Sequence, residues 1–558
     1  MVPMLVCCRG RVDEERKYDL ILKGNLLMKP KIEKTEKNKI DWMITLVPLT
    51  LVLGLSVLFF FMPEQSSAVV SQIRYFMGDT MGSYYLIIGL VIFFVSLYLA
   101  FSKYGNIVLG RQDEKPKYSF FAWGSMMFTA GLAADILFYS FSEWAYYAES
   151  ARVAELGGEG AAAIQEWAPV FPLFHWSIIP WGFYLVLAAA FGFMLNVRNR
   201  EKQKNSEACR PILGKHTDGI LGRFIDLLAV FALIAGTATT FSLATPLMAS
   251  AFNSLFGVQV DTTVVTVAML LITCAIYTYS LLHGIKGMSF LANSCIYLFF
   301  ALAIFTLLFG GEAKYIIETG LSSVGTMIQN FFGLATYTDP NRTSNFPQDY
   351  TIYYWAYWMV WCVASPFFIG TISRGRTIKQ PILGGYLFGA GSTLVSYMIL
   401  GNYSLGRQMS GKSDFLKTFN GGEGIYDMII EIIETLPAAP VILALVIITM
   451  LLLYATSFDA IALVASRYSY KKLKKGEEPS KWIQLMWCIL LIVLPIALLF
   501  AGSSRSNIES VSIVSAFPLA LVLVLITISF LKDAKKFSRE QTGEVQSESA
   551  EETAETEE

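Results

Sequence analysis

Long runs of apolar residues alternate with short polar segments along the chain, and this pattern predicts helices that cross a membrane. A helix needs roughly 20 apolar residues to span the hydrocarbon core of a bilayer. By that measure the sequence predicts 12 spans, at about 42–62, 84–102, 119–142, 168–196, 224–256, 262–282, 290–310, 351–372, 382–403, 438–466, 482–501 and 508–531. The fifth run, roughly 33 residues, is too long for a straight span and should tilt or break.

The distribution of basic residues supports this count, because lysine and arginine collect in cytoplasmic loops. They are frequent before the first span, in the 2–3, 4–5, 8–9 and 10–11 loops, and after the last span. The 1–2, 3–4 and 11–12 loops carry one each, at Arg74, Arg152 and Arg505. The alternation predicts a multi-pass protein of the plasma membrane with both termini in the cytoplasm.

The same pattern divides the chain into three parts. We expect a cytoplasmic N-terminal segment over residues 1–40, a membrane domain over 41–531, and a disordered cytoplasmic tail over 532–558, whose end is acidic and low in complexity. Within the outer loop at 311–350, the apolar stretch 315–336 is a candidate amphipathic surface helix.

Composition excludes several classes of protein. Hydrophobic residues make up 54% of the chain and charged residues 16%, against about 25% charge in soluble domains. The net charge of −1 gives no basic field for nucleic acid. Three histidines, and seven cysteines without metal-ligand spacing, indicate neither a metal centre nor a disulfide framework. Because no convergent catalytic set is visible, we expect no enzyme activity and no cofactor.

Span 3 contains an acid in its middle. Gly131 and the small residues after it would let the helix unwind, and Asp135 follows. An ionised carboxylate at that depth costs about 2.5–3.5 kcal/mol on insertion scales. A bound cation, a proton or a buried partner would offset that cost. The plainer alternative is a structural aspartate bonded to the backbone.

Span 4 carries aromatic residues around a proline. Trp176, Trp181 and Tyr184 surround Pro180, which should disrupt the helix locally. Trp181 and Tyr184 are three residues apart and share a face. His175 is a candidate proton carrier, although a neutral histidine bonded to a neighbouring helix is the favoured interpretation.

Span 8 is the densest in aromatic residues, with seven Trp and Tyr among residues 350–361, including Trp355, Tyr357, Trp358 and Trp361. Such rings also form belts at membrane interfaces, but this number exceeds one belt crossing. A cage of rings holds a quaternary ammonium through cation–π attraction of about 0.5–2 kcal/mol per ring. Spans 4 and 8 together are therefore candidates for such a cage.

Spans 5 and 10 supply hydroxyl groups, at Thr237, Thr239 and Thr240 and at Thr456 and Ser457. Hard oxygen ligands of this kind suit Na⁺. Serine and threonine also join membrane helices to one another, so an ion site and helix packing both stay open.

At these residues the sequence resembles the betaine/carnitine/choline transporter family. The similar stretches are Lys103–Gly110, the segment at Gly131, Phe174–Trp181, His283–Gly287, Trp355–Trp361, Ile372–Ile378 and Thr456–Asp459. They follow the family's order along the chain.

The resemblance implies a LeuT-like fold, in which two leading helices precede inverted five-helix repeats, spans 3–7 and 8–12. It implies quaternary ammonium substrates, an aromatic box of Trp176, Trp181, Tyr184 and Trp358, and a usual homotrimer in the lipid. Trp361 would be a second cation–π contact, and Phe138 an aromatic residue facing the substrate.

Several positions depart from the common family pattern. Tyr357 stands where tryptophan is usual, and Ala364 removes an aromatic residue near one Na⁺ site. The Glu143-Trp144 pair resembles the carnitine/γ-butyrobetaine antiporter branch, whereas Asp135 resembles the proton-coupled choline branch.

We therefore expect a secondary transporter of choline, carnitine, γ-butyrobetaine or glycine betaine, coupled to protons or to substrate exchange. A Na⁺-coupled glycine betaine symporter is the first alternative. A channel or a non-transporting sensor on the same fold is the second.

Overall fold

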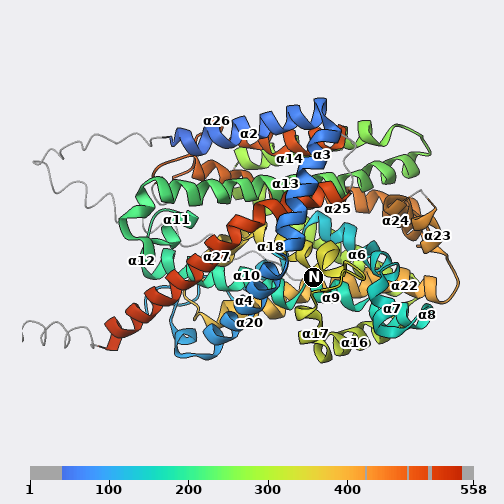
Figure 1. The fold of residues 1–558 in the computed structure, drawn as a ribbon, viewed down its shortest axis with the longest axis horizontal. Helices are drawn as coiled ribbons and strands as arrows, with labels where there is room; N and C mark the ends of the chain where they lie inside the picture. The colour runs from blue at the N-terminus through green and yellow to red at the C-terminus, as the bar shows by residue number, and fades with distance from the viewer. Residues whose placement is uncertain (1–39, 284, 422–423, 474–476, 501–504, 543–558) are drawn as a thin grey trace, which may run out of the picture. The chain divides into compact units, whose positions relative to one another are not determined.

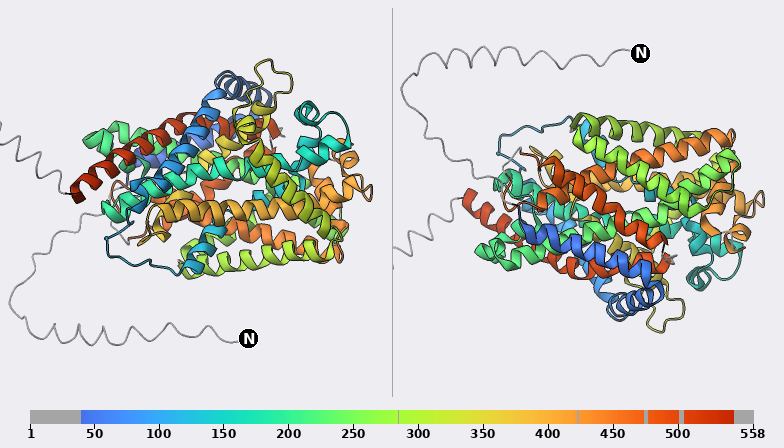
Figure 2. Two further views of the ribbon diagram at one scale, coloured as in Figure 1. Left: turned by 90° about the horizontal axis from the view of Figure 1, so that it is seen from below. Right: turned by 90° about the horizontal axis from the view of Figure 1, so that it is seen from above.

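The computed structural model describes residues 40–283, 285–421, 424–473, 477–500 and 505–542, with the backbone alone for 285–293 and 542. Within these ranges every regular element is a helix, apart from two isolated bridges. The long helices lie side by side as a bundle, and α27 runs obliquely across α10 and α13 (Figures 1 and 2). The predicted all-α membrane class is confirmed.

In the described part of the chain, nine helices are long and apolar enough to cross a membrane. Seven are single elements: α2 (Trp42–Phe61), α4 (Ser83–Phe101), α13 (Ile220–Phe256), α14 (Thr262–Leu282), α25 (Ala439–Tyr468), α26 (Lys481–Phe500) and α27 (Arg505–Thr542). One combines α8 (Ala161–Trp167), α9 (Val170–His175), α10 (Ile178–Gly192) and η3 (Phe193–Val197). Another combines α20 (Lys379–Gly384), η6 (Gly385–Ala390), α21 (Gly391–Ser396), η7 (Tyr397–Gly401) and α22 (Asn402–Met409).

Three bent pairs of helices raise the count to as many as 12 in the same described residues. They are α5 (Phe120–Thr129) with α6 (Ala134–Ala148), bent by 64°; η5 (Pro347–Thr351) and α18 (Ile352–Trp361) with α19 (Ser365–Ile372), bent by 56°; and α15 (Ile285–Phe309) with α16 (Ala313–Gln329), bent by 110°. The interruption predicted in span 3 is confirmed, and span 8 is bent as well. The helix predicted after the seventh span is also present, as α16 and α17 (Phe331–Thr336).

Shorter helices connect the spans. They are α3 (Pro63–Arg74), η1 (Tyr75–Thr80), η2 (Lys103–Asn106), α7 (Ala151–Gly157), α11 (Asn205–Ala208), α12 (Arg210–Leu213), η4 (Gly214–Asp218), α23 (Phe415–Asn420) and α24 (Gly424–Glu434).

Two long helices bear on predictions made from the sequence. The fifth span does not break, because α13 continues through Pro246 as one helix of 37 residues; its tilt stays a prediction. The last helix α27 continues to Thr542, so residues 532–542 form a helix where a disordered tail was expected. Residues 543–558 of that predicted tail, and the predicted N-terminal segment up to residue 39, lie outside the described residues.

Two of the family-like motifs meet in space. The backbone N–H of Leu109 donates to the carbonyl of Arg376 over 2.8 Å, and that of Ile378 donates to Ile107 over 2.9 Å. Gly375 has φ +79, and a Cβ there would lie 2.3 Å from the carbonyl oxygen of Lys115. The two stretches therefore form a short antiparallel pairing that joins the loop before α5 to the loop after α19.

Glycines allow α10 and α19 to cross at backbone contact. A Cβ at Gly370 would lie 2.7 Å from the backbone nitrogen of Gly192 and 2.8 Å from the carbonyl oxygen of Ala188. Small residues at such crossings let membrane helices approach closely. Because backbone atoms cannot turn away as side chains do, this crossing requires glycine at residue 370.

The Gly370→Ala variant tests this crossing. We expect it to lower the free energy of unfolding by about 1–3 kcal/mol, because the added methyl forces the two helices apart. Gly391→Ala is the matched control, since a Cβ there meets nothing within 4 Å. Thermal unfolding of the purified variants measures both, and equal stability of the two would contradict the assignment.

Candidate functional site

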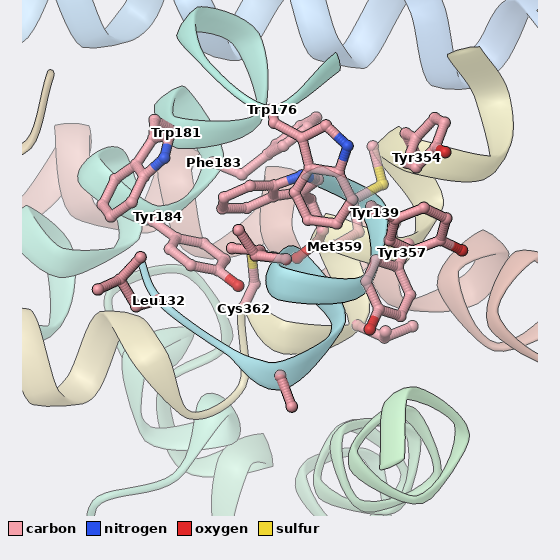
Figure 3. Close-up of a cluster of buried hydrophobic side chains, with 14 of the residues drawn as sticks. Leu132, Tyr139, Trp176, Trp181, Phe183, Tyr184, Tyr354, Tyr357, Met359 and Cys362 are labelled. Atoms are coloured by element: carbon pink, nitrogen blue, oxygen red, sulfur yellow. Dashed lines mark hydrogen bonds between the residues drawn. The ribbon is translucent and has the colours of Figure 1, made fainter. Parts of the chain in front are cut away.

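Four aromatic rings from two separate segments meet, with Trp358 in contact with the other three. The ring centroids of Trp176 and Trp181 each lie 5.8 Å from that of Trp358, and the centroid of Tyr184 lies 4.9 Å away. None of the four side chains is more than 5% exposed. In Figure 3, Trp181 and Tyr184 lie on one side of Trp176, with Tyr139, Tyr354 and Tyr357 on the other. The structure thus brings together the four residues of the predicted box.

A break in the fourth span positions Trp176. Helix α9 ends at His175, Ser177 has φ −124 and ψ −106, and α10 begins at Ile178. The predicted disruption at Pro180 is therefore misplaced by a few residues. Pro180 lies in the first turn of α10, where the missing N–H has no helical partner to lose. Because the break lies between Trp176 and α10, the direction of the Trp176 side chain is not set by the helical rotation that places Trp181.

Two glycines hold the indole of Trp181. A Cβ at Gly389 would lie 2.2 Å from the Trp181 ring, and one at Gly131 would lie 2.7 Å from it. Gly131 falls in the interruption between α5 and α6, and Gly389 lies in η6. The small residues that let span 3 unwind therefore also make room for a ring of the box.

A second layer of rings surrounds Trp176. Its ring centroid lies 5.5 Å from Tyr139, 5.4 Å from Tyr354 and 5.6 Å from Tyr397. The sequence prediction did not include these tyrosines. The dense aromatic run of span 8 could have indicated Tyr354, which lies within it. Tyr397 lies in another span, and no sequence pattern there indicated a site residue.

Three predicted site residues lie outside the group around Trp358. Trp355 packs against Phe174, with ring centroids 6.0 Å apart, and against Gly89. Trp361 lies 6.3 Å from Phe458 and contacts the α13 backbone at Gly236. Phe138 lies 5.8 Å from Tyr426 and lines a separate cavity.

That cavity has a volume of about 310 Å³ and adjoins the box. Its lining includes the aromatic residues Phe138, Tyr139 and Tyr146, together with Arg505. The guanidinium carbon of Arg505 lies 3.7 Å from the Tyr146 ring centroid. Tyr139 belongs to both places, because it also contacts Trp176. The cavity and the rings around Trp176 therefore share Tyr139 as a common wall.

Asp135 lies buried beside the box. Its Oδ2 accepts a hydrogen bond of 2.5 Å from the Tyr357 hydroxyl, which also bonds Thr240. Among the described residues, its Oδ1 has no hydrogen-bond partner. The Tyr357 ring in turn lies 6.3 Å from that of Trp176. Asp135 is the second residue of α6, where the helix dipole favours a negative charge. Tyr357 thus connects the carboxylate both to the rings and to α13.

The other candidate ion ligands have separate neighbours. Thr237 donates to the carbonyl of Leu233, and Thr239 bonds the Ser512 hydroxyl over 2.8 Å. Thr456 donates to the carbonyl of Leu453, and Ser457 follows it on α25. Within the described residues, these hydrogen bonds go to different partners and do not bring the hydroxyls together as ligands of one ion.

His175 joins three elements. Its Nδ1 lies 2.7 Å from the Tyr147 hydroxyl on α6, and its Nε2 lies 3.0 Å from Oγ1 of Thr351 in η5. The favoured interpretation of a histidine bonded to neighbouring helices is confirmed.

Comparison with known proteins identifies the class. The sequence pattern described as "BCCT, betaine/carnitine/choline family transporter" matches residues 43–539. The chain therefore belongs to the betaine/carnitine/choline transporter family, and it is a multi-pass membrane transporter of the betaine and carnitine type rather than an enzyme.

Three relatives illustrate the range of the family. The glycine betaine transporter OpuD of Bacillus subtilis (strain 168) is 28% identical over 86% of this chain and 91% of its own length. An uncharacterized transporter, YeaV of Escherichia coli (strain K12), is 27% identical over 81% and 92%. A carnitine transporter of Acinetobacter baumannii (strain ATCC 19606) is 26% identical over 78% of each chain.

The bond between Tyr357 and Asp135 can be tested by stability. We expect Tyr357→Phe to lower the free energy of unfolding by about 1.5–3 kcal/mol, because a buried carboxylate loses its donor. Tyr353→Phe on the same helix removes only a bond between two hydroxyls, 3.2 Å long, to Tyr139, and should cost about 1 kcal/mol. In the Asp135→Asn background the Tyr357→Phe effect should shrink. An undiminished effect there, measured by thermal unfolding, would contradict the pairing.

Proposed function

We propose that this transporter carries quaternary ammonium solutes across the plasma membrane by alternating access. The convergence of Trp176, Trp181, Tyr184 and Trp358 in a buried site is the observation that carries the proposal. A quaternary ammonium offers no N–H donor, so ring faces are the groups that can select its head, at about 0.5–2 kcal/mol each. Choline, carnitine, γ-butyrobetaine and glycine betaine share this head.

Entry of the head requires the rings to separate. A cation binds a ring face within about 6 Å of its centroid, yet the rings themselves lie only 4.9–5.8 Å from Trp358. A methylated nitrogen held between opposed faces therefore needs Trp358 to move away from its partners. The interruption at Cys362–Ala364, directly after α18, supplies a joint for that movement.

The buried carboxylate of Asp135 is evidence that the substrate or the coupling ion carries a positive charge. In the described contacts its carboxylate has neutral partners, one oxygen is unpartnered, and Tyr357 connects it to the box. Choline has no carboxylate of its own and gains most from this counter-charge. A proton is the other cation that fits. We propose Asp135 as the counter-ion or coupling residue of choline transport.

We propose coupling to protons or to substrate exchange, with Trp361 and Phe138 as contacts along the path. The scattered hydrogen bonds of Thr237, Thr239 and Thr456 favour this over Na⁺. The alternative of a Na⁺-coupled glycine betaine symporter rests on the OpuD relative. A channel is the third alternative.

We further propose the LeuT-like arrangement of two inverted repeats behind α2 and α4. The two breaks support it, since α5–α6 and α18–α19 would be the first spans of the two repeats, and both are bent. Cytoplasmic termini, a domain over residues 41–531 and a homotrimer complete the proposal.

Counterflow in proteoliposomes tests the transport function. We expect saturable exchange of at least one of choline, carnitine, γ-butyrobetaine and glycine betaine, without a requirement for Na⁺. Trp358→Leu keeps an apolar side chain but loses a ring face, so KM should rise about 3- to 30-fold. Trp42→Ala is the control, since Trp42 is 59% exposed on α2. Unsaturable flux would indicate a channel, and an unchanged KM in Trp358→Leu would contradict the box.

The Asp135→Asn variant tests the counter-ion. We expect it to abolish choline uptake or to remove the pH dependence of uptake, because amide nitrogen and oxygen carry no charge for a cation to pair with. Uptake is measured across a range of external pH with and without Na⁺. Unchanged uptake together with an unchanged pH profile would contradict the role of Asp135.

A further inference from the structure

A second acid lies on α6, on the edge of the box. Glu143 is fully buried, and its Oε2 accepts a hydrogen bond of 2.7 Å from Nε1 of Trp176. Its Oε1 accepts a hydrogen bond from the Tyr147 hydroxyl. Within the described contacts, neither oxygen meets a lysine or an arginine. Glu143 thus contacts the indole of Trp176 directly, and that indole packs against the ring of Trp358.

With a neutral His175, the hydrogen atoms of this network have one arrangement around an ionised Glu143. Tyr147 has a single hydroxyl hydrogen and donates it to the carboxylate, so its oxygen must accept from Nδ1–H of His175. The Nε2 of His175 then accepts from the Thr351 hydroxyl. Every donor in the series points toward Glu143, and these hydrogen bonds oppose the cost that burial places on its charged form. The histidine is neutral in this arrangement and does not cancel the charge.

We propose that Glu143 is a positioning residue that orients the Trp176 indole and strengthens its attraction for the cationic head of the substrate. An N–H that donates to a carboxylate shifts electron density into the indole, and hydrogen-bonded groups polarise one another in a low-dielectric interior. A more negative ring face holds a cation more strongly. The bond also fixes the plane of the ring. This inference rests on the proposed function of the box.

A purely structural role would give a different signature. If Glu143 only filled space and held α6 against α9, its loss would weaken every ligand of the same shape alike. If it acts on the charge of the ring face, its loss weakens a cation and spares an uncharged ligand of equal size. Choline and 3,3-dimethylbutan-1-ol, in which carbon replaces the nitrogen, form such a pair.

The experiment measures the Kd of both ligands for the full chain in lipid nanodiscs. For Glu143→Gln, which keeps an acceptor for the indole but loses the charge, we expect choline to bind about three- to tenfold more weakly and the carbon isostere to bind unchanged. Glu207→Gln is the matched control, because Glu207 is a buried glutamate in the 4–5 loop that pairs with Arg210. It should change neither Kd.

A double-mutant cycle tests the route through the ring. In the Trp176→Phe background the indole N–H is absent, so Glu143→Gln should have little further effect on the ratio of the two Kd values. Should Glu143→Gln fail to fold, Tyr147→Phe decides. This variant leaves the charge of Glu143 and its hydrogen bond to Trp176 in place. The Kd of the carbon isostere divided by the Kd of choline must therefore stay at or above the wild-type value, and a fall in that quotient would overturn the proposal.

The outcomes separate this inference from the proposed function. Equal weakening of choline and its isostere in Glu143→Gln, or full additivity with Trp176→Phe, would overturn the role of Glu143 alone. A wild-type chain that binds choline no better than the uncharged isostere would overturn the aromatic cation site itself.

Discussion

The contact of three aromatic rings with Trp358 depends on interrupted helices. A continuous helix presents its side chains in a fixed rotation of 3.6 residues per turn, and such helices would leave Trp176 and Trp181, five residues apart, on different faces. The break at Trp176–Ser177 releases that constraint, and the break between α5 and α6 opens the space in which Gly131 meets Trp181. In a membrane, interrupted backbone is tolerated only where protein or a polar cavity surrounds it. The aromatic site and the helix breaks therefore depend on each other and form a single structural feature.

Two buried acids lie beside this feature. Asp135 and Glu143 are eight residues apart on α6, about 12 Å along the helix axis, and both have hydroxyl or indole partners in the described contacts. Buried carboxylates without a basic partner are costly, so a protein retains them where they serve a function. A positively charged solute or a proton is the partner that such a site lacks.

The sequence predicted the spans well because the length of an apolar run is a local property. It also placed the interruption in span 3, since Gly131 and the residues after it are small, whereas the bend after Trp361 in span 8 was not located from the sequence. It misplaced the break in span 4 at Pro180, because a proline in a first helical turn and one in a helix interior look alike in the sequence. Trp355 was included with Trp358 for its spacing of one turn. Its neighbour Gly89 lies on α4, and that contact is visible only in three dimensions.

A structure of the full chain in lipid nanodiscs with choline bound, determined by cryo-electron microscopy, tests the central claim most directly. The account predicts density for the trimethylammonium group against the faces of Trp176, Trp181, Tyr184 and Trp358, with Trp358 displaced from its three partners. Density for the solute at another place, or these rings pointing toward lipid, would contradict it.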